Sequence, residues 1–188
     1  MRRHLLIAAA AAALLSAAAP APASARGADY VFDGGAAPAR AEVRRALAAS
    51  AFDWSVIPER VVVHVRPGVD SHATPGHVWL DEELLRSGRF AWAVVQDEFA
   101  HQVDFFLFDT AVRERLNREL GGRMWCYGEG RAAHGEYGCE RFASTLVWSY
   151  WQSPDNAYRP RSARDESAAL APARFRALLA SVITASRR

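Results

Sequence analysis

The chain has 188 residues, of which 51% are hydrophobic and 23% are charged. This composition is typical of one globular domain with a core of its own, and it excludes disordered and collagen-like chains. The formal charge is only +2, and every basic residue is an arginine. Arg2 and Arg3 lie in a segment that we expect to be removed, and the remaining chain is then neutral. A nucleic-acid partner is therefore not expected.

The N-terminus has the three regions of a secretory signal peptide. Arg2 and Arg3 form a positive start, residues 5–19 are an apolar run, and Ala23-Ser24-Ala25 supplies the small residues of a cleavage site. The apolar run is shorter than a membrane-spanning helix requires. We therefore expect residues 1–25 to be cleaved and residues 26–188 to be secreted, outside the cell or in its envelope, with no membrane segment.

Regular structure is expected over most of the mature chain. Asp81 and Asp109 are placed to cap the starts of helices, while residues 26–37 and 123–138 read as a lead-in and a loop. The pattern predicts strands over 60–66 and 76–80 and helices over 38–51, 82–86, 89–108, 110–120, 139–151 and 168–185. The sum is one α+β domain, with a small sheet packed against several helices.

Two cysteines, Cys126 and Cys139, lie in the second half of the chain. Outside the cytosol they can form a disulfide, which would stabilise the fold by about 3 kcal/mol in the chain-entropy model. The alternative is a pair of buried free thiols. Their spacing is not that of a zinc–thiolate site, which usually contains a C-x-x-C pair.

The most informative segment is the apolar helix predicted around residues 90–108. It carries Asp97, Glu98, His101 and Asp104, and buried carboxylates need a compensating partner. Because residues i and i+4 project side by side, Asp97 and His101 can reach one metal ion. Glu98, next to the first ligand, is then placed as a general base toward water, as in H-E-x-x-H zinc peptidases. The alternative is a hydrogen-bonded Asp97–His101 pair, with arginines neutralising Glu98 and Asp104.

A second apolar helix begins near Glu140, which can supply a third ligand from its first turn. Leu107 stands six residues after His101, so the chain lacks the arrangement in which one continuous motif holds three ligands. The alternative for Glu140 is an ion pair with Arg141 or Arg131.

The loop before Glu140 holds further candidates. His134 could replace a ligand or donate to an oxyanion, and the alternative is a surface histidine with a local hydrogen bond. Tyr127 and Tyr137 could also donate to a developing oxyanion. Three further histidines near the strands are read as structural: His64, His72 and His77.

The string EFAHQVD at residues 98–104, followed by ERFAS at residues 140–144, resembles the gluzincin-type zinc metallopeptidases. It is most similar to small single-domain members such as the Mlc titration factor A family, whose motifs read HEFAHQ[LV]D and later EFFA. The resemblance implies a zincin-like domain with an active-site helix and a Glu helix. It also implies Glu98 as general base, His101 and Glu140 as zinc ligands, and Asp104 as a supporting residue outside the ligand set. An edge strand above the metal would hold extended peptide, and residues 76–80 stand where that strand is expected.

The sequence departs from the family at the first ligand, where Asp97 replaces histidine. An aspartate can bind zinc, but it is shorter and adds negative charge, so the site would be harder and could prefer another divalent ion. We therefore expect a secreted, metal-dependent peptidase-like protein that hydrolyses peptide bonds of a peptide or protein substrate. The alternatives are a catalytically inactive binding domain on the same scaffold, or a structural domain with ion-paired carboxylates.

Overall fold

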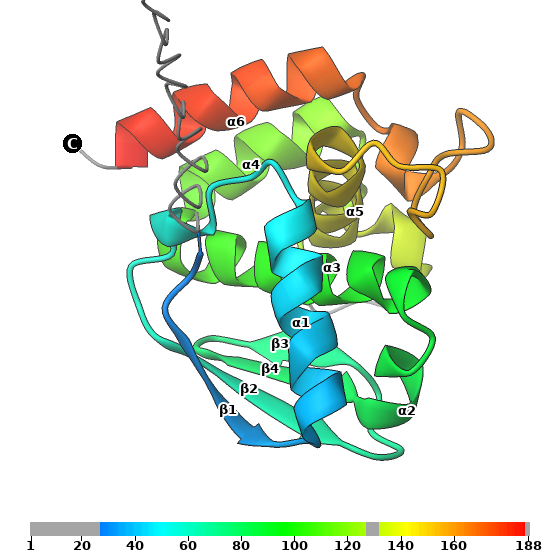
Figure 1. Ribbon diagram of the computed structural model, residues 1–188. Helices are drawn as coiled ribbons and strands as arrows, with labels where there is room; N and C mark the ends of the chain where they lie inside the picture. Colours follow the sequence, from blue (N-terminus) through cyan, green and yellow to red (C-terminus); the bar gives the residue numbers. More distant parts are fainter. Residues whose placement is uncertain (1–26, 127–131, 187–188) are drawn as a thin grey trace, which may run out of the picture.

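The computed structural model describes residues 27–126 and 132–186. Its four strands form one layer, and the helices all lie on the same side of that sheet (Figure 1). This arrangement confirms the α+β class. The predicted signal peptide, residues 1–25, lies outside the described residues. The elements, in chain order, are β1 (Tyr30–Gly34), α1 (Ala37–Ala49), η1 (Trp54–Val56), β2 (Val61–Arg66), β3 (His72–Thr74), β4 (His77–Asp81), α2 (Glu82–Leu85), α3 (Arg89–Leu107), α4 (Thr110–Leu120), η2 (His134–Glu136), α5 (Gly138–Tyr150), η3 (Glu166–Ala168) and α6 (Pro172–Ser186).

The sheet has the strand order β1-β2-β4-β3, with β3 antiparallel to β4 and the other neighbours parallel. Alternation along each strand decides which side chains meet the helices. In β2, Val61, Val63 and Val65 are buried, and in β4, Val78 and Leu80 are buried. The remaining positions of both strands face the side that carries no helix in the described part of the chain (Figure 1).

Two expectations about the sheet were wrong. Residues 26–37 contain β1, which was expected to be an irregular lead-in. The strand has only five residues, and it is followed by Gly34 and Gly35, whose positive φ angles of 81° and 73° give that segment the appearance of a turn. In addition, β4 is an inner strand and not the edge. The edge is β3, whose three residues are too few to produce a recognisable pattern.

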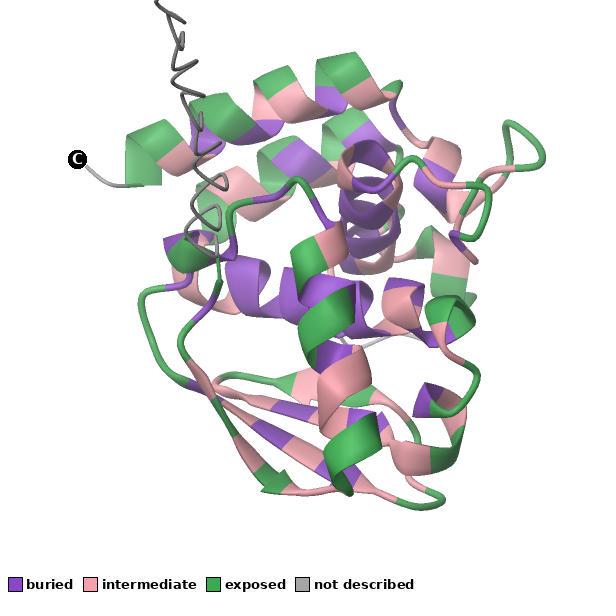
Figure 2. Ribbon diagram, viewed as in Figure 1, coloured by how far each residue is buried: buried purple, intermediate pink, exposed green. Residues whose placement is uncertain are grey.

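The helices that position the site follow the predicted boundaries closely. Helix α3 lies between the sheet and α5, and both helices are buried over most of their length (Figures 1 and 2). The predicted caps are present, since Asp81 accepts a hydrogen bond from the N–H of Glu83 and Asp109 accepts one from Val112. The last helix begins later than expected, at Pro172, because proline favours the first turn of a helix over its interior. None of the helices in residues 27–126 and 132–186 has the length and apolar character needed to cross a membrane.

The core gives a direct test of this packing. Phe99 on α3 is fully buried, and its ring packs edge-on against Tyr30 and Trp54. We expect Phe99→Ala to lower the free energy of unfolding by about 3–5 kcal/mol, because it leaves a cavity between the helix and β1. On the same helix, Phe90 is 58% exposed, so Phe90→Ala should cost less than about 0.5 kcal/mol. Urea unfolding measures both values, and equal losses would contradict the packing.

Candidate metal centre

Helix α3 brings three ionisable side chains to its contact with α5. Asp97, Glu98 and His101 are 6%, 7% and 7% exposed. Neighbouring residues of the same helix are apolar, and Phe99, Ala100 and Val103 are fully buried. Charges at such a place require a partner, because desolvation costs several kcal/mol per uncompensated ion.

Glu140 faces these side chains from the first turn of α5, and a disulfide fixes its position. Cys126 and Cys139 are bonded, with their Cα atoms 5.6 Å apart, which confirms the predicted pairing. Both sulfur atoms lie 3.4 Å from Oε1 of Glu140. The bond therefore ties the loop that follows α4 directly to the residue beside Glu140.

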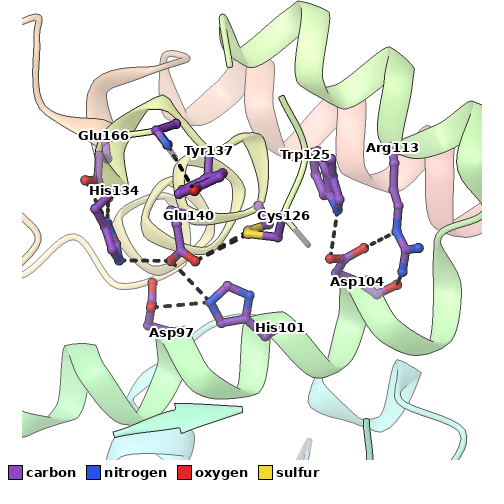
Figure 3. The surroundings of a disulfide bond; sticks show 12 residues. Asp97, His101, Asp104, Arg113, Trp125, Cys126, His134, Tyr137, Glu140 and Glu166 are labelled. Atoms are coloured by element: carbon purple, nitrogen blue, oxygen red, sulfur yellow. Dashed lines mark hydrogen bonds and ion pairs between the residues drawn. A yellow bond between two sulfur atoms is a disulfide. The ribbon is translucent and has the colours of Figure 1, made fainter. Parts of the chain in front are cut away.

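The two helices meet at His101 (Figure 3). Its Nε2 atom lies 3.4 Å from Oε2 of Glu140 and 3.8 Å from Oδ2 of Asp97. Two ligand atoms that share a tetrahedral zinc ion are about 3.3 Å apart, given bonds of about 2.0–2.1 Å. The His101–Glu140 distance matches this value, and Asp97 is slightly too far. The structure thus brings together all three predicted ligands, with Asp97 as the outlying member.

One group of described residues has potential ligand atoms that all lie within 4.8 Å of one another: His101, Cys139 and Glu140. The Cys139 sulfur belongs to the disulfide, so it carries no thiolate for a metal. Of this group, only the imidazole nitrogen and the carboxylate oxygen remain as donors in the oxidised protein. Further ligands must come from the neighbouring side chains.

His134 is one such neighbour. It lies on η2, and its Nε2 atom is 3.2 Å from Oε2 of Glu140 (Figure 3). Its other ring nitrogen, Nδ1, is 3.0 Å from Oε1 of Glu166. A metal-binding histidine usually donates its second N–H to a carboxylate, which fixes the ring and the tautomer. His134 has this partner. Sequence reasoning missed Glu166, because no spacing rule links residues 134 and 166.

These side chains line a cavity of about 410 Å³ that also contains Glu98. No hydrogen bond from a described residue reaches the Glu98 carboxylate. The other walls come from the edge of the sheet and from the segment after α5. The lining residues are Ser71, His72, Ala73, Val94, Asp97, Glu98, His101, His134, Glu140 and Tyr158. His72 and Tyr158 were not among the predicted site residues: His72 was expected to be structural, and Tyr158 lies between the predicted helices over 139–151 and 168–185.

The electrostatics show a surplus of negative charge. Burial raises the pKa of Asp97, and it raises the pKa of Glu98 to about 7. Burial alone would lower the pKa of His101, but its hydrogen bond to Glu140 and the neighbouring carboxylates raise the pKa to about 9. Glu140 has the opposite balance: burial acts to raise its pKa, and the two histidines hold it below the ordinary value. Without another cation, the site therefore retains protons.

Two buried atoms of this site have no hydrogen-bond partner among the described residues, namely Oδ1 of Asp97 and Nδ1 of His101. A buried carboxylate oxygen without a partner is costly, and a divalent cation is one group that removes this cost. The donor set also suits such an ion, because zinc accepts imidazole nitrogen and carboxylate oxygen. The residues present therefore fit a divalent metal.

The remaining candidates lie elsewhere. Asp104 points away from the group, where its oxygens accept hydrogen bonds from Arg113 at 2.7 Å and from Trp125 at 2.9 Å (Figure 3). The hydroxyl of Tyr137 accepts a hydrogen bond from the N–H of Ala132 at 3.2 Å. Tyr127 lies outside the described residues.

The alternative partner for Glu140 within the described chain, Arg141, donates instead to the carbonyls of Leu120 and Gly135. Arg131, the other alternative, lies outside the described residues. In the described chain, arginine thus neutralises Asp104 but not Asp97 or Glu140.

Comparisons with protein-family models, with curated proteins and with solved structures gave no match for this chain. Its function must therefore be argued from the geometry of this site. The likeness of the two motifs to gluzincins stays an interpretation of the sequence.

The buried carboxylate Glu98 makes the stability of the metal-free protein depend on pH. Its pKa is about 7 in the folded state against 4.5 ordinarily, so stability falls as the pH rises between these values. His101 adds to the loss between its ordinary 6.5 and about 9. Glu98→Gln removes the first contribution, so the variant should be more stable than wild type above pH 7 by about 3 kcal/mol.

Urea unfolding in the presence of a chelator, from about pH 5 to about pH 8, measures this difference. Glu83→Gln is the matched control, because the Glu83 side chain is 68% exposed and the change should have almost no effect. A Glu98→Gln variant no more stable than wild type above pH 7 would contradict the burial of a charged Glu98.

Proposed function

We propose that this chain is an exported, metal-dependent hydrolase that acts on peptides. The observation that carries the proposal is the meeting of His101 from α3, Glu140 from α5 and His134 from η2 within hydrogen-bonding distance, next to Asp97. No arginine within the described residues neutralises this group. Export is supported by the predicted signal peptide and by the disulfide, which persists in oxidising compartments.

His101, Glu140 and His134 would hold the metal, with Asp97 as a fourth donor. Zinc suits the nitrogen donors, and the carboxylates also allow a harder divalent ion. When bound, such an ion polarises a substrate carbonyl and lowers the pKa of water.

Glu98 is the proposed general base. Its carboxylate lines the same cavity, and it is not engaged by a hydrogen bond from any described residue. It can therefore take a proton from the attacking water and return it to the leaving amine.

Tyr158 is the proposed donor to the developing oxyanion. Burial and the surrounding carboxylates raise the pKa of its phenol far above the ordinary value, so the hydroxyl keeps its proton. A protonated phenol in the cavity can stabilise negative charge on a carbonyl oxygen.

The cavity is bordered by β3, and this supports a peptide as substrate. Strand β3 is the edge of the sheet, and Ser71, His72 and Ala73 line the cavity. An extended peptide can pair with an edge strand through main-chain hydrogen bonds. The amide of Gln102 holds this edge from below, because it donates to the carbonyls of Thr74 and His77.

A second function is favoured by Asp97 itself. Its carboxylate is 3.8 Å from His101 and belongs to a shorter side chain than the histidine of H-E-x-x-H motifs. A site of this kind can hold an ion too weakly for catalysis, which would leave a peptide-binding domain without hydrolytic activity.

Metal binding distinguishes both of these functions from a purely structural domain. Purified chain, stripped with a chelator and titrated with zinc, manganese or calcium in a calorimeter, should bind one equivalent of at least one ion. Saturation to 100 times the Kd should raise stability by about 2.7 kcal/mol. His101→Ala and Glu140→Gln should abolish binding, whereas Asp104→Asn, outside the site, should retain it. Absence of binding for all three ions would refute the metal site.

Hydrolysis of casein or of a quenched peptide library distinguishes the enzyme from the inactive domain. We expect the metal-loaded wild type to cleave and Glu98→Gln to bind metal but lose cleavage by about a hundredfold or more, as is typical of a missing general base. Cleavage that survives Glu98→Gln would contradict the role of Glu98. A metal-loaded wild type that cleaves nothing, but gains activity with Asp97→His, would favour the binding domain.

A further inference from the structure

A second cavity of about 490 Å³ adjoins the candidate metal centre. It is formed mainly by residues 157–167, in the segment of the chain that connects α5 to α6. Two residues, His134 and Tyr158, line both cavities. The two cavities therefore share a wall at these residues.

Three arginines line this second cavity: Arg159, Arg161 and Arg164. All three are exposed, and their guanidinium groups make no hydrogen bond or ion pair with a described residue. This sets them apart from arginines such as Arg66, Arg89 and Arg174, which pair with carboxylates at 2.7 Å, 2.6 Å and 2.8 Å. Three unpaired guanidinium groups at one cavity form a site for an anion.

The acidic residues of the cavity offset only part of this charge. Asp165 accepts hydrogen bonds from the N–H and the hydroxyl of Ser162, at 3.1 Å and 2.8 Å, and from the N–H of Arg161. Glu166 is bonded to His134. Three guanidinium groups against two carboxylates leave a positive balance.

The segment that carries the arginines is held in place by hydrogen bonds that are buried or partly buried. Asn156 donates to the carbonyl of Trp151 at 2.7 Å and accepts from the N–H of Tyr158 at 2.8 Å. At its far end, Thr145 donates to the carbonyl of Glu166 at 3.2 Å. The backbone that carries the arginines is therefore already held in place, so ligand binding does not carry the entropic cost of ordering it.

We infer that this second cavity binds a carboxylate group of the peptide substrate, next to the bond held at the metal centre. This inference rests on the proposed function, and it specifies the substrate as an acidic peptide. Guanidinium groups bind carboxylates in a planar, two-hydrogen-bond geometry, so they distinguish glutamate from glutamine. The carboxylate belongs either to an acidic side chain or to the C-terminus of the peptide.

Binding of labelled peptides, measured by fluorescence anisotropy, tests the inference without hydrolysis. The protein is the mature chain with Glu98→Gln, both zinc-loaded and chelated. The probes are an end-blocked alanine peptide with one central glutamate, its glutamine counterpart, and an all-alanine peptide with either a free or an amidated C-terminus. We expect at least one carboxylate peptide to bind about tenfold more tightly than its neutral counterpart. Preference for the glutamate peptide assigns the side chain, and preference for the free acid assigns the C-terminus.

The combined variant Arg159→Gln, Arg161→Gln and Arg164→Gln should lose this preference. The control Arg60→Gln with Arg174→Gln removes two exposed arginines elsewhere and should keep it. Because all these side chains are exposed, folding should be unaffected, and circular dichroism checks this.

Equal binding of charged and neutral peptides by the Glu98→Gln chain, no measurable binding of any peptide at millimolar concentration, or a preference that survives the triple variant would each overturn the inference. A chain that prefers carboxylates but binds no metal would instead refute the proposed function and leave the anion site standing.

Discussion

The central physical constraint in this protein is the burial of carboxylates between two apolar helices. Asp97 and Glu98 on α3 and Glu140 on α5 lie where packing is otherwise made by aliphatic and aromatic side chains. An apolar side chain at any of these positions would pack without an electrostatic cost. The presence of charged side chains at these positions is explained if they have a function, such as binding a cation. Burial raises the pKa of both Asp97 and Glu98, because this environment disfavours their charged forms.

Elements from different parts of the sequence hold the residues of the candidate metal centre in place. The sheet and α1 support α3 from one side, and α5 covers it from the other (Figure 1). The Cys126–Cys139 disulfide anchors the start of α5, and Glu166 orients His134 toward Glu140. These contacts support the side chains that carry the donor atoms, so the geometry of the site depends on the packing of the whole domain.

Much of this could be predicted from the sequence. The long apolar helix α3, its polar side chains and the helix that begins near Glu140 have strong periodicity. The chain has two cysteines, so each has only the other as an intramolecular partner. The metal-ligand candidates Asp97, His101 and Glu140 do come together. Helical spacing places Asp97, His101 and Asp104 near one face of α3, so it does not distinguish the residue outside the site, Asp104, from the two inside it. Asp104 accepts hydrogen bonds from Arg113 and Trp125, which lie outside α3 and therefore cannot be related to it by helical spacing.

Other features of the fold and of the site could not be predicted, because they depend on contacts between residues that are far apart in the sequence. Strand β3 is too short to recognise, and its place at the sheet edge follows only from the pairing with β4. Glu166 and Tyr158 reach the site from the segment after α5, whose polar sequence resembles an ordinary connection. The same segment carries the arginines of the second cavity, so the least patterned part of the sequence contributes to both pockets.

The most direct measurement is a crystal structure of the zinc- or manganese-soaked chain, with anomalous diffraction recorded at the metal edge. We expect one anomalous peak in contact with Nε2 of His101 and Oε2 of Glu140, with Nε2 of His134 or a carboxylate oxygen of Asp97 completing the ligands. A soaked crystal with no peak there, in which His101 and Glu140 keep their direct hydrogen bond, would contradict this expectation.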